Sequence, residues 1–222
     1  MIARCLGYAV ATVVTIVPVG PALASQASQA PAGWTYRLDG AQELADGQDM
    51  APGQWRYTSM PPGWHVTTTE QGVLLFAQDR ALTGRWGIEV ELFLFPNPGE
   101  AGLGVVVEAA DRPEGSLQLQ FVMRRDGAAA LLGRHDGVDS MLVAWTSDSA
   151  VAAHTGDVDK FVLRVVHDAG ALAFSINGHE MFAVPTGGEG FQAMPGLRVG
   201  PGLNVHVARF DLITPLAPPR RR

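Results

Sequence analysis

Apolar and polar residues alternate along much of this chain. The stretches 88–95, 117–124, 161–166 and 171–176 place an apolar side chain at every second position. Successive side chains of an extended strand point to opposite faces, so this period predicts strands with one buried face. Two other runs, 105–107 and 141–144, are apolar at every position. We expect these two in the middle of a layered structure, covered on both faces.

Turn signals separate these runs. The Asn-Gly pair at 177–178 predicts a tight hairpin between 171–176 and 179–184, because both residues tolerate positive φ. The Asp-Gly pairs at 126–127 and 136–137, and the Asp-Ala-Gly run at 168–170, mark further turns. Between 203 and 213 the apolar parity changes, which indicates either two covered faces or a bulge near Ala208.

Helical patterns are confined to two short stretches, 40–46 and 148–154. Many short strands without crossover helices favour antiparallel connections. The sequence therefore predicts an all-β fold, an antiparallel β-sandwich of jelly-roll type, as a single domain over 34–214.

The first 24 residues are typical of a secretory signal peptide. Arg4 precedes an apolar run at 6–19, and Ala22-Leu23-Ala24 fits the rule for the cleavage site. The run is shorter than the roughly 20 residues that a membrane-spanning helix needs. We therefore expect an exported protein, periplasmic or extracellular, without a membrane span. Residues 25–33 are expected to form a flexible leader and 215–222 an extended Pro/Arg tail.

Charge and cysteine content exclude several classes of function. The net charge of the 222 residues is −6, and removal of 1–24 makes it −7 because only Arg4 is lost. Nucleic-acid binding needs a surplus of Lys and Arg, so it is not expected. The one cysteine, Cys5, lies in the signal peptide, which leaves no disulfide or cysteine zinc site. The six histidines lack zinc-ligand spacing, and no metal or other cofactor is expected.

Several motifs follow one another in a familiar order. They are GRWGIEVE at 84–91, GLGVVV at 102–107, LQLQF at 117–121, FSING at 174–178 and RFDL at 209–212. This order resembles the concanavalin A-like lectin/glucanase superfamily, and within it laminin-G-like and 3-keto-disaccharide hydrolase-like domains. The stretch 64–76 resembles the opening strand pair of such domains. The resemblance covers about two-thirds of the chain, from Trp64 to Ile213. It implies two curved antiparallel sheets, with a sugar site on or beside the concave face.

The resemblance does not supply a catalytic set. Retaining glucanases of the superfamily carry three acids at alternate positions of one strand, which aims the carboxylates into one cleft. This chain offers Glu89 and Glu91, but Phe93 stands where a third acid would be. Two polar residues on a solvated sheet face explain the pair as well. Whether the protein is an enzyme stays open at this point, and if it is one, we expect a glycoside hydrolase.

Sugar-binding side chains can still be proposed. Trp145 ends an apolar strand before the polar loop 146–149, where an exposed indole could stack on a sugar ring. Gln118, Gln120 and Arg124 share one face of one strand, and beside Glu89 and Glu91 they could form a polar concave strip.

A polar loop offers further candidates. Arg134, His135 and Asp136, with Asp139, could bind a sugar hydroxyl or calcium, although an exposed turn explains them too and two aspartates are too few for a calcium site.

Three functional hypotheses follow from the sequence. The first is an exported, non-catalytic, carbohydrate-binding domain of the cell envelope whose partner is an oligosaccharide or glycan. The second is a glycoside-cleaving enzyme of the 3-keto-disaccharide hydrolase type. The third is an envelope scaffolding or protein-interaction domain. The sequence names neither the sugar nor the oligomeric state.

Overall fold

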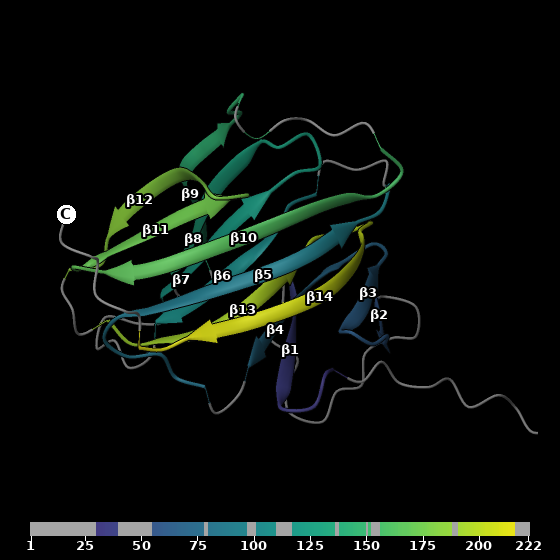
Figure 1. Cartoon of the computed structure of the whole chain (residues 1–222), viewed down its shortest axis with the longest axis horizontal. Helices are drawn as coiled ribbons and strands as arrows, with labels where there is room; N and C mark the ends of the chain where they lie inside the picture. Colours follow the sequence, from purple (N-terminus) through teal and green to yellow (C-terminus); the bar gives the residue numbers. More distant parts are fainter. Residues whose placement is uncertain are drawn as a thin grey trace, which may run out of the picture.

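The computed structural model (Figure 1) describes fourteen β-strands. The described residues are 30–39, 55–77, 80–96, 101–109, 117–135, 138–149, 151, 156–187 and 191–215. Strands and their connections account for all of these ranges, and the described part holds no helix that is long and apolar enough to cross a membrane.

The strands form two sheets of seven. Sheet A has the order β1 (Trp34–Asp39), β4 (Gly72–Ala77), β13 (Ala193–Val199), β6 (Leu103–Ala109), β7 (Leu117–Met123), β8 (Ala129–His135) and β9 (Val138–Thr146). Sheet B has the order β12 (His179–Pro185), β11 (Ala171–Ile176), β10 (Asp159–Asp168), β5 (Trp86–Leu94), β14 (Asn204–Ile213), β3 (Trp64–Thr68) and β2 (Trp55–Ser59).

Every neighbouring pair of strands is antiparallel. Figure 1 shows sheet B lying in front of sheet A. The predicted all-β antiparallel sandwich is confirmed.

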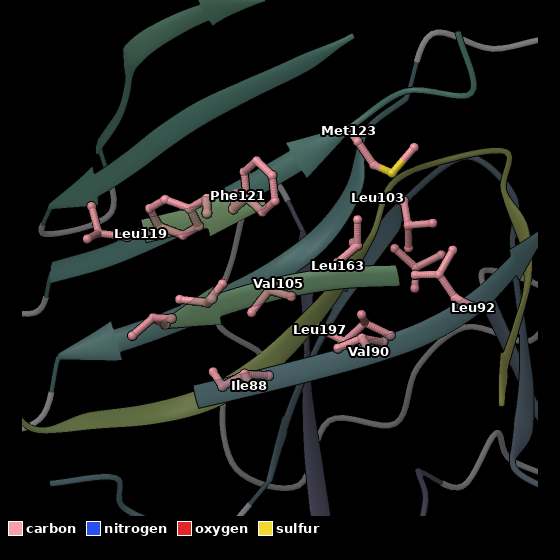
Figure 2. Packing of buried hydrophobic residues seen from close by; sticks show 14 of the residues in the cluster. Ile88, Val90, Leu92, Leu103, Val105, Leu119, Phe121, Met123, Leu163 and Leu197 are labelled. Atoms are coloured by element: carbon pink, nitrogen blue, oxygen red, sulfur yellow. The ribbon is translucent and has the colours of Figure 1, made fainter. Parts of the chain in front are cut away.

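The core lies between the two inner faces. Ile88, Val90 and Leu92 of β5 point toward Val105 of β6 and Phe121 of β7, as Figure 2 shows, and all five are fully buried. Burying such a side chain contributes roughly 1.5–3 kcal/mol. The alternation in β5, β10 and β11 appears in the structure as the predicted pattern of one buried face.

The turn chemistry also agrees with the sequence. Asn177 and Gly178 have φ of 50° and 81° and join β11 to β12. Gly127 has φ of 83° in the turn between β7 and β8, where the Asp126 side chain accepts a hydrogen bond from the Ala128 amide at 2.9 Å. Of the two alternatives for 203–213, the bulge near Ala208 is present, since the register of β14 against β5 shifts there. The segments 1–24, 40–46 and 136–137 lie outside the described residues, and so do residues 150 and 152–154 of the stretch 148–154.

Three expectations about strands were wrong. The apolar run 141–144 lies not in the middle of a layer but in β9, the edge strand of sheet A, where Met141 is 55% and Leu142 52% exposed. In β7 the polar face is buried as well as the apolar one. The stretch 64–76 gives two strands that do not pair, because β3 joins sheet B and β4 joins sheet A.

Candidate functional site

The outer faces of the two sheets differ in how far they are buried. The outer side chains of sheet A include Leu74, Phe76, Val106 and Val122, none of which is more than 1% exposed. Outer side chains of sheet B, such as Glu89 of β5, are half-buried or exposed. We call the outer side of sheet A the sheltered face and that of sheet B the open face. Ligand sites are mostly lined by apolar side chains with a small number of placed polar groups.

Close approach of the strands fixes two glycines in the middle of sheet A. A Cβ on Gly196 would lie 2.5 Å from the carbonyl oxygen of Leu75, and one on Gly104 would lie 1.7 Å from that of Phe121. Neither position can carry a side chain without moving the backbone of the next strand. The centre of the sheltered face therefore has little side-chain volume of its own, and longer side chains reach over it from both ends.

At the β1 end, Arg37 covers the apolar part of the face. Its guanidinium carbon lies 4.3 Å from the centroid of the Phe76 ring. The same guanidinium forms an ion pair with Glu108 of β6, two strands beyond β4 in the order of sheet A. Leu74, Phe76 and Val106 form a small cluster separate from the main core. Arg37 therefore covers the Phe76 ring on the outer side of the sheet.

At the β9 end, Trp145 and Arg124 stack on each other. The guanidinium carbon of Arg124 lies 3.9 Å from the centroid of the Trp145 ring. The far edge of the indole reaches over Gly102, where a Cβ would lie 3.3 Å from Cη2 of Trp145. The expectation of an exposed Trp145 needs correction, because the ring is half-buried and one of its faces carries a guanidinium. The guanidinium is held there by its attraction to the negative face of the indole, and it covers that face.

Between the two ends lies a hydrogen-bonded relay of polar side chains. Nη1 of Arg198 donates to Oε1 of Gln120 at 2.9 Å, and Nε2 of Gln120 donates to Oε1 of Gln118 at 2.6 Å. Gln118 and Gln120 are only 4% and 2% exposed. Arg134 of β8 stands directly opposite Gln118, and its Nε lies 2.8 Å from Oδ1 of Asp139. Buried amides held in this way are rigid hydrogen-bonding groups.

The structure brings five of the predicted site residues onto one face: Gln118, Gln120, Arg124, Arg134 and Trp145. His135 is the exposed last residue of β8, on the opposite parity to Arg134. Asp136 lies outside the described residues, so the predicted loop cluster is seen only as Arg134 with Asp139.

The expected place of Glu89 and Glu91 was wrong. Both lie on β5 in sheet B, on the open face, and therefore not beside Gln118 and Gln120. Nη2 of Arg209 lies 2.7 Å from Oε1 of Glu89, and Nζ of Lys160 lies 2.9 Å from Oε1 of Glu91. The two carboxylates thus belong to an ion-pair network on a half-exposed sheet surface.

The open face also carries a row of rings. His206 pairs with Phe93 on one side and with His65 on the other, and its ring centroid lies 6.0 Å and 5.9 Å from theirs. Nε2 of His65 bonds the Asn204 side chain, so His65 is a hydrogen-bonded strand residue. Desolvation lowers the pKa of His206 from its ordinary value, and the nearby His65 lowers it further. These contacts hold the strands of sheet B together.

Three residues of the sheltered face escaped the sequence reasoning: Arg37, Glu108 and Arg198. Glu108 and Arg198 each stand as a single charge in an otherwise apolar strand, and that isolation was the available signal. In the described ranges no three His, Cys, Asp or Glu side chains gather as a metal ion would require.

Solved structures with this arrangement include three bacterial proteins. A carbohydrate-binding module (CBM66) from Bacillus subtilis aligns at 9% identity and a TM-score of 0.53, over 82% of this chain and 96% of its own. A family 16 glycoside hydrolase, an endo-glucanase from Bacteroides ovatus, aligns at 10% identity and a TM-score of 0.54, over 81% of this chain and 94% of its own. A Bacillus subtilis protein of unknown function with a galectin-like fold aligns at 13% identity and a TM-score of 0.55, over 81% of this chain and 88% of its own.

The fold is that of the concanavalin A-like lectins and glucanases. At these identities the likeness concerns the fold and not the activity. No protein-family model matches the chain, and no curated protein does either.

Proposed function

We propose that this protein binds a carbohydrate on the sheltered face of sheet A. One observation carries the proposal: the stacked Trp145–Arg124 pair stands beside the buried relay of Arg198, Gln120 and Gln118. A flat aromatic surface suits the C–H face of a sugar ring. Fixed amide and guanidinium groups next to it suit the hydroxyl groups at the ring's edge.

Two structural neighbours support the proposal. One is a carbohydrate-binding module, and another, at a TM-score of 0.51 and 10% identity, is the carbohydrate recognition domain of Emp46p. Both align over 82% of this chain. The proposal nevertheless rests on the side chains, because the fold is shared by proteins of several activities.

A glycan array followed by calorimetry tests the proposal. We expect the wild type to bind at least one glycan on the array. Removal of the indole ring in Trp145→Ala should weaken that binding by about fivefold, since ring contacts are worth about 0.5–1.5 kcal/mol. Phe93→Ala, which removes a half-buried ring from the open face, is the matched control and should bind as the wild type does. A silent array, or equal losses in both variants, would refute the site.

We propose that binding occurs without glycoside cleavage. The usual hydrolytic mechanism needs two carboxyl groups about 5–9.5 Å apart. The two carboxylates that pair with arginines on the sheltered face, Glu108 on β6 and Asp139 on β9, are three strands apart. At about 4.8 Å per strand their backbones are separated by about 14 Å. The resemblance to 3-keto-disaccharide hydrolase-like and laminin-G-like domains stays a prediction. Release of reducing sugar from a glycan by the wild-type protein would favour the glycoside hydrolase hypothesis instead.

We also propose that the protein is exported and that residues 1–24 are removed. Arg4, the apolar run 6–19 and the Ala22-Leu23-Ala24 sequence support this. Mass spectrometry of the protein expressed in a secreting bacterium should find Ser25 at the amino terminus. An intact Met1 on the folded product would contradict the proposal.

A protein-interaction role is a second candidate, favoured by strand β9. This edge strand exposes Val138 to 70%, Met141 to 55% and Leu142 to 52%. An apolar edge strand can pair with the same edge of a second copy. Sedimentation of the wild type should then show a concentration-dependent dimer that Met141→Lys abolishes. A monomer at every concentration would remove this candidate.

A further inference from the structure

The relay on the sheltered face has a fixed direction. Arg198 can only donate hydrogen bonds, whatever else it contacts, so the Gln120 group that faces it must be the amide oxygen. The Gln120 amide nitrogen then donates to the Gln118 oxygen. An arginine at one end therefore orients both buried amides.

The relay ends in donors. With its oxygen engaged by Gln120, Gln118 still has the two N–H groups of Nε2 to donate. Within the part of the chain that the structure describes, this Nε2 makes no hydrogen bond of its own, although Gln118 is only 4% exposed. The N–H groups of this Nε2 are therefore free for a ligand that accepts hydrogen bonds.

The charged groups around Gln118 point to the same kind of ligand. Its two cross-strand neighbours are Glu108 on β6 and Arg134 on β8. Arg37 already neutralises Glu108, which limits repulsion of an incoming anion. The ion pairs, ring contacts and relay of this face involve four arginines and two carboxylates: Arg37, Arg124, Arg134, Arg198, Glu108 and Asp139. Guanidinium groups only donate, so the face as a whole offers donors.

We propose that the carbohydrate bound on the sheltered face is acidic, and that the carboxylate of a uronic acid accepts hydrogen bonds from Nε2 of Gln118 between Arg134 and Arg198. This inference rests on the proposed carbohydrate binding. A carboxylate only accepts, and its charge-assisted bonds are about twice as strong as neutral ones. A sugar hydroxyl both donates and accepts, so it uses such a surface less fully.

Paired ligands that differ only in charge test this inference. Short oligomers of galacturonate, glucuronate and mannuronate are titrated calorimetrically into the full chain, each beside its fully methyl-esterified form. We expect one acid to bind at least about tenfold tighter than its ester, as charge-assisted bonds require. The advantage should shrink as sodium chloride is raised, because salt screens partly exposed charges.

Variants locate the effect at the relay. Gln118→Glu replaces the Nε2 donor by an acceptor of the same shape and should abolish the preference for the acid while the ester still binds. Arg134→Gln should reduce the preference without burying a new charge, which covers the case in which Gln118→Glu does not fold. Arg209→Gln on the open face removes the same charge far from the relay, and its preference should equal that of the wild type.

Each outcome has one meaning. Equal affinity for acid and ester, or tighter binding of neutral glycans, would overturn the acidic ligand and leave carbohydrate binding in place. An unchanged preference in both Gln118→Glu and Arg134→Gln would overturn the relay as its cause. Failure to bind any uronate, ester or array glycan would instead overturn the proposed function itself.

Discussion

The two outer faces of the sandwich differ in what their charged and aromatic side chains contact. On the open face, ion pairs such as Arg209–Glu89 and the row of rings around His206 lie between strands and remain half in water. On the sheltered face, Phe76 is fully buried beneath Arg37 although it points away from the core. Charges on the sheltered face thus cover apolar side chains, whereas those on the open face mainly pair with each other.

This difference separates structural polarity from functional polarity. A polar residue on a solvated sheet is inexpensive and needs no further explanation. Gln118 and Gln120 are polar and almost fully buried, which costs free energy unless their bonds are made. Their relay to Arg198 meets most of that cost, and the donor left at Gln118 is available to a ligand. Burial therefore distinguishes the candidate site better than residue type does.

The same substitution on each face gives the largest expected contrast. Phe76→Ala should lower the free energy of unfolding by about 3–5 kcal/mol, the usual cost of removing a buried ring. Phe93→Ala on the open face should cost about 1–2 kcal/mol, since that ring is half-buried and acts through cross-strand contacts. Equilibrium urea unfolding measures both. Equal costs would mean that the sheltered face is no better packed than the open one.

Close strand approach beneath the sheltered face gives a smaller effect. Gly196→Ala places a Cβ 2.5 Å from the Leu75 oxygen and 2.9 Å from Cδ1 of Phe76, and should cost about 1–3 kcal/mol. Gly156→Ala is the control, because the nearest atom there lies 3.6 Å away, and its effect should stay within about 0.5 kcal/mol. Thermal unfolding followed by circular dichroism distinguishes the two. A neutral Gly196→Ala would show that the strands can separate freely.

Double-mutant cycles compare the ion pairs of the two faces. Arg37 and Glu108 have side chains 33% and 15% exposed, against 49% and 23% for Arg209 and Glu89. We expect a coupling of roughly 1–2 kcal/mol for the first pair and roughly 0.2–1 kcal/mol for the second. Glutamine at each position keeps the size and removes the charge. A larger coupling energy for the Arg209–Glu89 pair would contradict the inference that Arg37 is held over the Phe76 ring by Glu108.

The smallest effect is a dependence of stability on pH that comes from the open face. The folded pKa of His206 lies below its ordinary 6.5, so the unfolded chain binds the proton more readily. Its contribution to stability is therefore present above 6.5 and is lost as the pH falls through 6.5 toward the lower folded pKa. His206→Gln should flatten this part of a plot of Tm against pH. An unchanged slope would show that His206 does not titrate there.

A second group acts in a separate range of pH. Arg85 donates two hydrogen bonds to Asp168, at 2.6 and 2.9 Å, and holds the pKa of that carboxyl below its ordinary 3.8. Stability from this pair is present above pH 3.8 and is lost as the pH falls further. Asp168→Asn serves as a control that should leave the slope just below pH 6.5 unchanged.

Local patterns predicted the strands with one solvated face. In β5, β10 and β11 every second residue is apolar because only one side meets the core, and the sequence shows that directly. The same logic failed for β9, since an apolar run looks alike in a central strand and at an edge. It also could not show that the polar side of β7 is buried, because that depends on side chains from other strands.

Part of the candidate site could be predicted, because parity within one strand is a local property, whereas the order of the strands is not. Gln118, Gln120 and Arg124 share a parity within one strand, and their common face could be inferred. Glu89 and Glu91 could not be placed relative to them, because strand order is set by pairing between distant segments. Arg37 and Arg198 were missed since their partners lie 71 and 78 residues away in the chain.

The sequence by itself determined where the chain extends and where it turns. Side-chain alternation and positive φ at positions such as Gly178 act over a few residues, so they are visible without a fold. Only the tertiary structure decided which strands became neighbours and hence which charges share a face. That choice depends on burying the apolar sides of fourteen strands together. It placed Arg198 on Gln120, left Nε2 of Gln118 as a donor, and put Glu89 and Glu91 on the opposite side of the molecule.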